Sequence, residues 1–193
     1  MACAEFQMLK RIPTKGTRGS GGSFAIVASR YNARYVDAML RAARTELKRA
    51  GAHRILVVRV PGAYEIPIVA AQLASRSAGD ATRHPPPARL SAIICLGVIL
   101  RGETVHAAHI GAVVSQALMQ IQLEHGVPVI HEVLLLENEQ QAHARCLSKT
   151  HNRGAEAAQT ALAMARVMAT LPGGCRRTTP FRTGIGPPHP RLS

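Results

Sequence analysis

The chain has 193 residues, of which 47% are hydrophobic, and it carries a formal net charge of +13. This length is typical of one domain with its own core, and the lack of a long apolar run excludes a membrane-spanning segment. Only 3% of the residues are aromatic and Trp is absent, which argues against a nucleic-acid platform built on base stacking.

The positive charge is concentrated at the two ends of the chain. Four basic residues and one acidic residue give residues 1–22 a charge of +3, and four arginines give residues 172–193 a charge of +4. Both segments have the Gly-rich or Pro-rich composition of flexible tails, so we predict one folded domain over residues 23–171. Nonspecific attraction of polyanions by the tails stays open, but a specific nucleic-acid function is not indicated.

The four cysteines, at positions 3, 95, 146 and 175, are far apart in sequence. Cys95 lies in an apolar run, where a buried, reduced thiol is expected, and this favours a reducing cytoplasm. The N-terminal segment has no apolar core typical of a secretory signal. Its basic composition leaves an organellar transit peptide as the alternative.

Strands and helices are predicted to alternate along the chain. In the first half they are strand 24–28, helix 36–47, strand 55–60 and helix 67–74, followed by a connection over 75–89 that contains three prolines. In the second half they are strand 93–96, a helix from His106 to Gly126, strand 127–136, helix 139–147 and helix 154–169. This alternation predicts a parallel sheet with helices on both faces.

The helix after His106 has the clearest pattern. Its apolar stripe consists of Ile110, Val113, Val114, Ala117, Leu118 and Ile121. Met119 and Leu123 lie off this stripe and form a second apolar face. We therefore predict that the helix packs against another subunit as well as against its own core.

Polar residues follow the predicted strands at 29–32, at 62–65 and at 97–106, and these strand ends should converge at one edge of the sheet. We expect His131, on the fourth strand, at the same edge. A strand that ends at Gly97, followed by Gly102 and a helix start, indicates an anion site. Glu103 follows Gly102 where a phosphate-loop NTPase would have Lys, so that class is excluded.

The residue types alone leave several roles open. His106 is an acid or base, or else an exposed or capping histidine. His106 and His109, three residues apart, lack the additional His or carboxylate ligands that a metal site would need. Arg145 and Arg153 are phosphate ligands or solvated surface arginines. Glu65 is a buried acceptor or an exposed residue at a helix start.

Five segments and His106, taken together, point to a known family. The segments are 29–32 (SRYN), 60–67 (VPGAYEIP), 95–104 (CLGVILRGET), 126–130 (GVPVI) and 152–158 (NRGAEAA). In this order and spacing, over about residues 23–170, the chain resembles the 6,7-dimethyl-8-ribityllumazine synthase family of riboflavin biosynthesis.

The resemblance implies a flavodoxin-like α/β fold, a three-layer sandwich around a four-stranded parallel sheet. It also implies a transferase that condenses 5-amino-6-(D-ribitylamino)uracil with 3,4-dihydroxy-2-butanone 4-phosphate and releases phosphate and water. An amine attacks the ketone to give an imine, phosphate is eliminated, and ring closure follows. No metal and no redox cofactor are implied.

The resemblance further implies a role for each site residue. Tyr31 stacks on the pyrimidine, His131 stands where the family commonly has Phe against that ring, and His106 transfers protons. The pyrimidine and its ribityl chain are lined by Ala63, Tyr64, Glu65, Val98, Ile99 and Leu100. The phosphate is bound by the backbone amides of Glu103 and Thr104 and by the Arg145 side chain.

Some positions depart from the family pattern. Ala107, Ala108 and His109 replace an aromatic, an acidic and an aromatic residue after the catalytic histidine. Glu132 replaces a small residue, and Arg153 stands where Lys is common. The expected consequences are an altered environment for His106 and altered pyrimidine binding at His131.

The family assembles as pentamers or as pentamer-based icosahedral shells, with active sites between neighbouring subunits. The implied partners are therefore small-molecule substrates and further copies of the chain, with no membrane and no specific nucleic acid. Two alternatives are a non-catalytic oligomer that binds flavin or lumazine, and a cage whose basic tails gather polyanions.

Overall fold

The computed structural model describes residues 21–78, 89–102, 105–148 and 150–172. The strands are β1 (Ser23–Ser29), β2 (Arg54–Val60), β3 (Leu90–Leu100) and β4 (Val129–Leu136). The helices are α1 (Ala33–Arg49), α2 (Ile66–Ala78), α3 (His106–His125), α4 (Glu139–Ala142) and α5 (Arg153–Thr170), with a π-helical segment η1 (His143–Leu147) directly after α4. None of the helices in these ranges has the length and apolar content needed to cross a bilayer.

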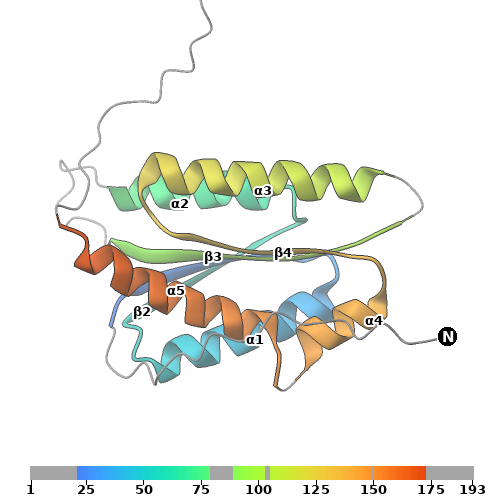
Figure 1. The fold of residues 1–193 in the computed structure, drawn as a ribbon, viewed down its shortest axis with the longest axis horizontal. Coiled ribbons are helices and arrows are strands. Elements are labelled where there is room, and N and C mark those ends of the chain that lie inside the picture. Colours follow the sequence, from blue (N-terminus) through green and yellow to red (C-terminus); the bar gives the residue numbers. More distant parts are fainter. Residues whose placement is uncertain (1–20, 79–88, 103–104, 149, 173–193) are drawn as a thin grey trace, which may run out of the picture.

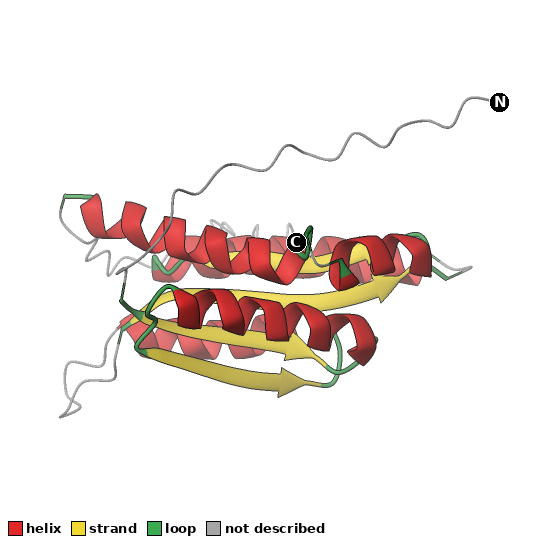
Figure 2. Cartoon of the chain, turned by 90° about the horizontal axis from the view of Figure 1, so that it is seen from below, coloured by secondary structure: helices red, strands yellow, loops and turns green. Residues whose placement is uncertain are grey.

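The four strands form one parallel sheet in the order β2-β1-β3-β4. Helices α2 and α3 cover one face, while α1 and α5 cover the other (Figure 1). Figure 2 shows the arrowheads of the strands pointing the same way. This order is that of a flavodoxin-like doubly wound sheet, so the predicted α/β three-layer sandwich is confirmed.

The core consists of two clusters, one on each face of the sheet. Alternate residues of the central strands point into opposite clusters, as Ile26 and Val27 do in β1. Cys95 of β3 is fully buried, as predicted, and burial raises the pKa of its thiol well above the usual range.

The third strand is longer than predicted. We expected it to end before Gly97, but β3 continues to Leu100, so residues 97–100 are strand and not loop. A Cβ at Gly97 would lie 3.1 Å from Val133 Cγ1 and 3.3 Å from Ile66 Cδ1. The glycine therefore permits close packing inside the sheet and does not end the strand.

Other boundaries differ more modestly. Helix α2 extends to Ala78, into the predicted connection, and residues 79–88 with the three prolines lie outside the described ranges. The predicted helix 139–147 is divided into α4 and η1. Helix α3 ends as predicted, because Gly126 adopts a φ of +62° that favours glycine.

The packing of α5 on α1 depends on Gly154, the second residue of α5. A Cβ at this position would collide with the backbone carbonyl of Met39 in α1. Gly111 of α3 is the matched contrast, since a Cβ there would make only 3.7 Å contacts with Leu135.

We expect Gly154→Ala to lower the free energy of unfolding by roughly 2–3 kcal/mol, because a rigid backbone group cannot move aside as a side chain can. Gly111→Ala should be neutral or stabilising by up to about 1 kcal/mol. Denaturant unfolding of both variants measures this. Equal stabilities of the two variants would show that the α1–α5 contact is not close.

Candidate active site

The loop after β1 is attached to the loop after β2. Arg30 donates its backbone N–H to the carbonyl of Val60 at 2.8 Å, and Tyr31 donates to the carbonyl of Pro61 at 3.1 Å. The Tyr31 ring consequently lies beside Gly62, where a Cβ would be 3.1 Å from Tyr31 Cδ2. The ring is nevertheless 72% exposed, so one of its faces is available to a ligand.

Glu65 closes the turn after β2. Its carboxylate accepts a hydrogen bond of 2.8 Å from the backbone N–H of Gly62, and the residue is half-buried. Glu65 thus lies between the two readings that the sequence left open, because it is half-buried, stands directly before α2 and accepts a backbone N–H of its own turn. Beside it, Ala63 is buried and Tyr64 is exposed.

Asn32 connects these loops to β3. Its side-chain amide donates to the carbonyl of Val98 at 2.8 Å. Its backbone has a φ of 54°, a left-handed conformation that Asn adopts more readily than most residues. Sequence reasoning assigned Asn32 no role. The available signal was an Asn directly before a helix, where left-handed backbone and side-chain bonding are common.

The edge of the sheet is completed by β3 and α3. Val98 is buried, while Ile99 and Leu100 are half-buried, and all three belong to the strand. His106 is the first residue of α3 and is exposed. Val105 precedes it without a side-chain cap, and the N–H groups of Ala108 and His109 donate to the Val105 carbonyl. The start of a helix favours a nearby anion. Glu103 and Thr104 lie outside the described residues.

His131 does not lie at this edge, contrary to our expectation. It is the third residue of β4 and pairs with Cys95 in the middle of β3. Because β4 continues to Leu136, His131 lies about 16 Å short of the carboxyl end of its strand.

The His131 imidazole instead faces α3. Its Nε2 is 2.9 Å from Ser115 Oγ. Desolvation lowers the pKa of His131 below its usual value, which favours the neutral ring. The residue borders a shallow groove of about 200 Å³ between α3 and β4, lined by Ser115, Leu118, Met119, Gln122, Val129 and His131.

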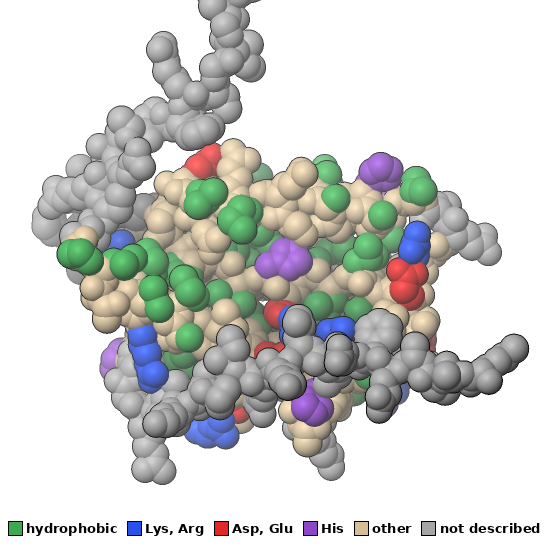
Figure 3. Space-filling view, viewed as in Figure 1, with side chains coloured by type: hydrophobic (Ala, Val, Ile, Leu, Met, Phe, Trp, Pro, Cys, Tyr) green, Lys and Arg blue, Asp and Glu red, His purple; other side chains and the backbone are tan. Residues whose placement is uncertain are grey.

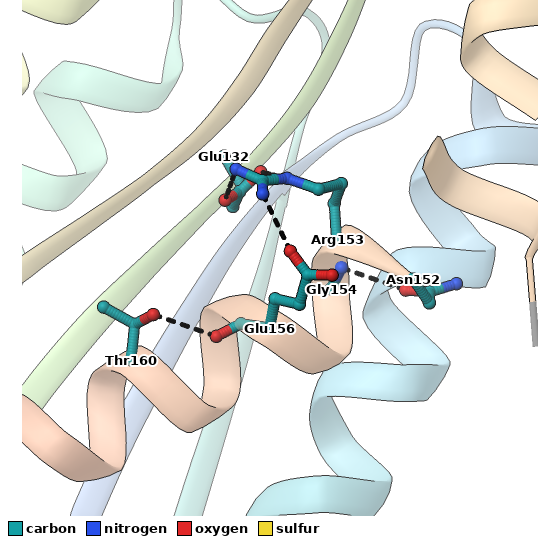
Figure 4. A network of polar contacts seen from close by, with 6 residues as sticks. All are labelled: Glu132, Asn152, Arg153, Gly154, Glu156 and Thr160. Carbon is teal, nitrogen blue, oxygen red and sulfur yellow. Dashed lines mark hydrogen bonds and ion pairs between the residues drawn. The ribbon is translucent and has the colours of Figure 1, made fainter. Parts of the chain in front are cut away.

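A charged cluster lies on the opposite face of β4. The guanidinium of Arg153 donates to both carboxylate oxygens of Glu132, at 2.7 and 3.1 Å, and to Glu156 at 2.7 Å (Figure 4). Arg145 of η1 is half-buried and lies within electrostatic reach of Glu132. Of the two arginines considered for phosphate, Arg153 is therefore already paired within the chain.

The candidate residues thus form two groups in one chain. The edge group is Tyr31, Asn32, Ala63, Tyr64, Glu65, Val98, Ile99, Leu100 and His106, and the flank group is His131, Glu132, Arg145, Arg153 and Glu156. Among the described residues, no hydrogen bond or ion pair joins the two groups.

The face that carries β4 also exposes apolar side chains. Figure 3 shows hydrophobic side chains scattered over α3, along the sheet edge and at the end of α5. The large exposed hydrophobic residues of α3, β4 and the end of α5 are Val113, Met119, Leu123, Leu135, Val167, Met168 and Leu171. Met119 and Leu123 belong to the second face of α3 that the sequence pattern indicated.

Comparisons with known proteins agree on one family. The family model described as 6,7-dimethyl-8-ribityllumazine synthase matches residues 21–169. A relative of that name from Stenotrophomonas maltophilia (strain R551-3) is 41% identical over 151 residues, which is 77% of this chain and 90% of the relative. Another from Xanthomonas euvesicatoria pv. vesicatoria is 40% identical over 157 residues, 80% of this chain and 95% of the relative.

The Asn32 bond gives a testable prediction about how the edge is assembled. Asn32→Ala removes the bond to Val98 and places Ala in a left-handed conformation, so we expect a loss of about 1–3 kcal/mol of unfolding free energy. Asn32→Gly removes the bond but fits the backbone, and should lose less. Denaturant titration compares the two variants. Wild-type stability in both would contradict a structural role for Asn32.

Proposed function

Because the chain belongs to the 6,7-dimethyl-8-ribityllumazine synthase family, we propose that it condenses 5-amino-6-(D-ribitylamino)uracil with 3,4-dihydroxy-2-butanone 4-phosphate as a transferase of riboflavin biosynthesis. The observation that carries the proposal is the family match over residues 21–169. Phosphate and water are the other products. The proposed catalytic domain is residues 23–171, with the tails 1–22 and 172–193 outside it.

The edge group supplies a binding place for the pyrimidine. The ring of Tyr31 is exposed while its backbone is held by Pro61, so a planar ligand can stack on it with little reordering. Backbone groups of Ala63, Tyr64 and Glu65 and of Val98, Ile99 and Leu100 border the same edge. These groups would line the ring and the ribityl chain, with the Glu65 carboxylate holding its own turn in shape.

His106 is the proposed proton-transfer residue. Imine formation, phosphate elimination and ring closure each move a proton, and an imidazole can accept and donate protons near neutral pH. His106 is exposed at the start of α3, next to the amides proposed for phosphate. Proton transfer and the departing phosphate would therefore occur close together, with Glu103 and Thr104 contributing backbone amides.

His131 and Arg145 are proposed to act on a neighbouring copy of the chain. His131 lies on the edge strand β4, well short of the carboxyl end of that strand. Arg145 belongs to the same flank group. A second copy that covers the exposed apolar residues of α3 would bring this flank to the edge group of its neighbour. We accordingly propose a homo-oligomer built from pentamers.

We also propose that the enzyme is cytoplasmic. Cys95 and Cys146 are free, buried thiols, which is the state expected in a reducing compartment. No step of the proposed reaction requires a metal or a redox cofactor.

His106→Ala should lower kcat for lumazine formation by roughly 10²–10⁴-fold, because a positioned acid–base group contributes about this factor. His109→Ala, one helical turn away and also exposed, is the matched control and should keep most of the activity. Product is followed by its visible absorbance. Wild type that binds lumazine without turnover, or full activity in His106→Ala, would contradict the proposal.

A shared site predicts complementation between inactive variants. His106→Ala and Arg145→Ala are each expected to be impaired, the latter through a raised KM for the phosphate substrate. When the two are mixed and reassembled at equal amounts, about a quarter of the interfaces receive both native residues, so about a quarter of wild-type activity should return. No recovery in verified hybrids would place both residues in sites within one chain.

A further inference from the structure

Glu132 is a buried carboxylate at the flank of the proposed site. It is 6% exposed, and it is the one charged side chain among the buried residues of the described ranges. Its neighbour His131 faces α3, whereas Glu132 faces α5, because successive residues of a strand alternate. A carboxylate in such a position is unfavourable unless it is paired.

Arg153 provides that pairing with every nitrogen of its guanidinium. Nε and Nη2 bond the two oxygens of Glu132, and Nη1 bonds Glu156 (Figure 4). The fork-to-carboxylate geometry is the same that Arg offers to a phosphate. While both carboxylates are ionised, the guanidinium is therefore occupied by groups of its own chain.

The start of α5 is held in place next to η1. Asn152 accepts a hydrogen bond from the N–H of Gly154 at 2.9 Å and donates to the carbonyl of Cys146. These bonds fix the elements that carry Arg145 and Arg153 relative to each other. Two guanidinium groups thus lie near one buried carboxylate.

We propose that Glu132 is an internal competitor for the substrate's phosphate: it occupies Arg153, so that Arg145 alone serves the phosphate unless Glu132 is protonated and releases Arg153. This inference rests on the proposed function for the identity of the anion. With Glu132 and Glu156 ionised, they balance the charges of Arg145 and Arg153. Protonation of Glu132 leaves one positive charge uncompensated, and anion binding becomes stronger.

Because Glu132 is buried, its protonation occurs near neutral pH. Burial raises the pKa of Glu132 to about 7, against the opposing influence of Arg153 and Arg145. The groups that face it are Arg153 and Glu156 of α5 and Arg145 and Cys146 of η1. Burial raises the pKa of Cys146 to about 12, so its thiol stays neutral and does not contribute.

Sulfate serves as the probe because it stays divalent between pH 6 and pH 8. Its binding to the full-length assembled protein is measured by titration calorimetry. Wild type should bind sulfate about tenfold more tightly at pH 6 than at pH 8, because one charge within a few ångströms changes. Glu132→Gln keeps the shape and removes the charge, so it should bind tightly at both values. Arg145→Ala should weaken binding at both, which identifies the site.

Two further variants separate the mechanism from general electrostatics. Glu137→Gln removes an exposed carboxylate that pairs with Arg101, and it should keep the wild-type pH dependence. Arg153→Ala should remove the tightening at pH 6, and Glu132→Gln should then have little further effect in that background. The wild type and Arg153→Ala suffice if Glu132→Gln does not fold.

Turnover gives an independent reading. At pH 8, Glu132→Gln should lower KM for the phosphate substrate severalfold and leave KM for the pyrimidine nearly unchanged. Sulfate binding that is independent of pH in wild type, with active enzyme, would overturn the role of Glu132 and leave the proposed function intact. The expected sulfate behaviour without any turnover would overturn the function and keep the role of Glu132 in anion binding.

Discussion

Burial of β1 and β3 on both faces is the constraint on which the rest of the architecture depends. Residues 24–29 and 92–98 are all buried. Their backbone groups are satisfied by the neighbouring strands, and helices must cover both faces of such a sheet. Charged side chains therefore have little room except beyond the strand ends and on the edge strands, as Arg59 of β2 and Glu132 of β4 show. The two groups of candidate residues lie in those two places.

Much of the fold was predictable because its strongest signals are local. The end of α3 at Gly126 and the burial of Val114, Leu118 and Ile121 follow from glycine backbone freedom and helical period. Val113 of the predicted stripe is 48% exposed, because the buried face of α3 is narrower than the pattern indicated. Gly97 was misjudged because a glycine that admits Val133 and Ile66 looks, in sequence, like one that ends a strand. The difference depends on neighbours that are 31 to 36 residues away, and no local pattern reports it.

The candidate site was predictable where it depends on topology and not where it depends on particular contacts. Parallel strands bring their carboxyl ends together, so Tyr31, Glu65 and Val98 were expected to meet. The Asn32–Val98 bond spans 66 residues and required the structure. His131 was placed at the wrong edge because the length of β4 beyond it was not weighed. Within the described part of one chain, no hydrogen bond or ion pair joins its group to the edge group, and the contact between them is a proposal that needs a second copy.

The Glu132–Arg153 pair is better explained by function than by stability. Dehydration of the buried Glu132 carboxylate and of the half-buried Arg153 guanidinium offsets much of their attraction, so such a pair contributes little net stability. The sheet pairing of Leu96 with position 132 uses only backbone groups.

The same fold would therefore form without this carboxylate. What the carboxylate changes is the charge available to an anion at Arg153 and Arg145. Since its protonation is balanced near neutral pH by burial against two arginines, a small change in surroundings, such as a neighbouring subunit covering this flank, shifts that balance. Anion affinity and assembly would then be coupled through one side chain.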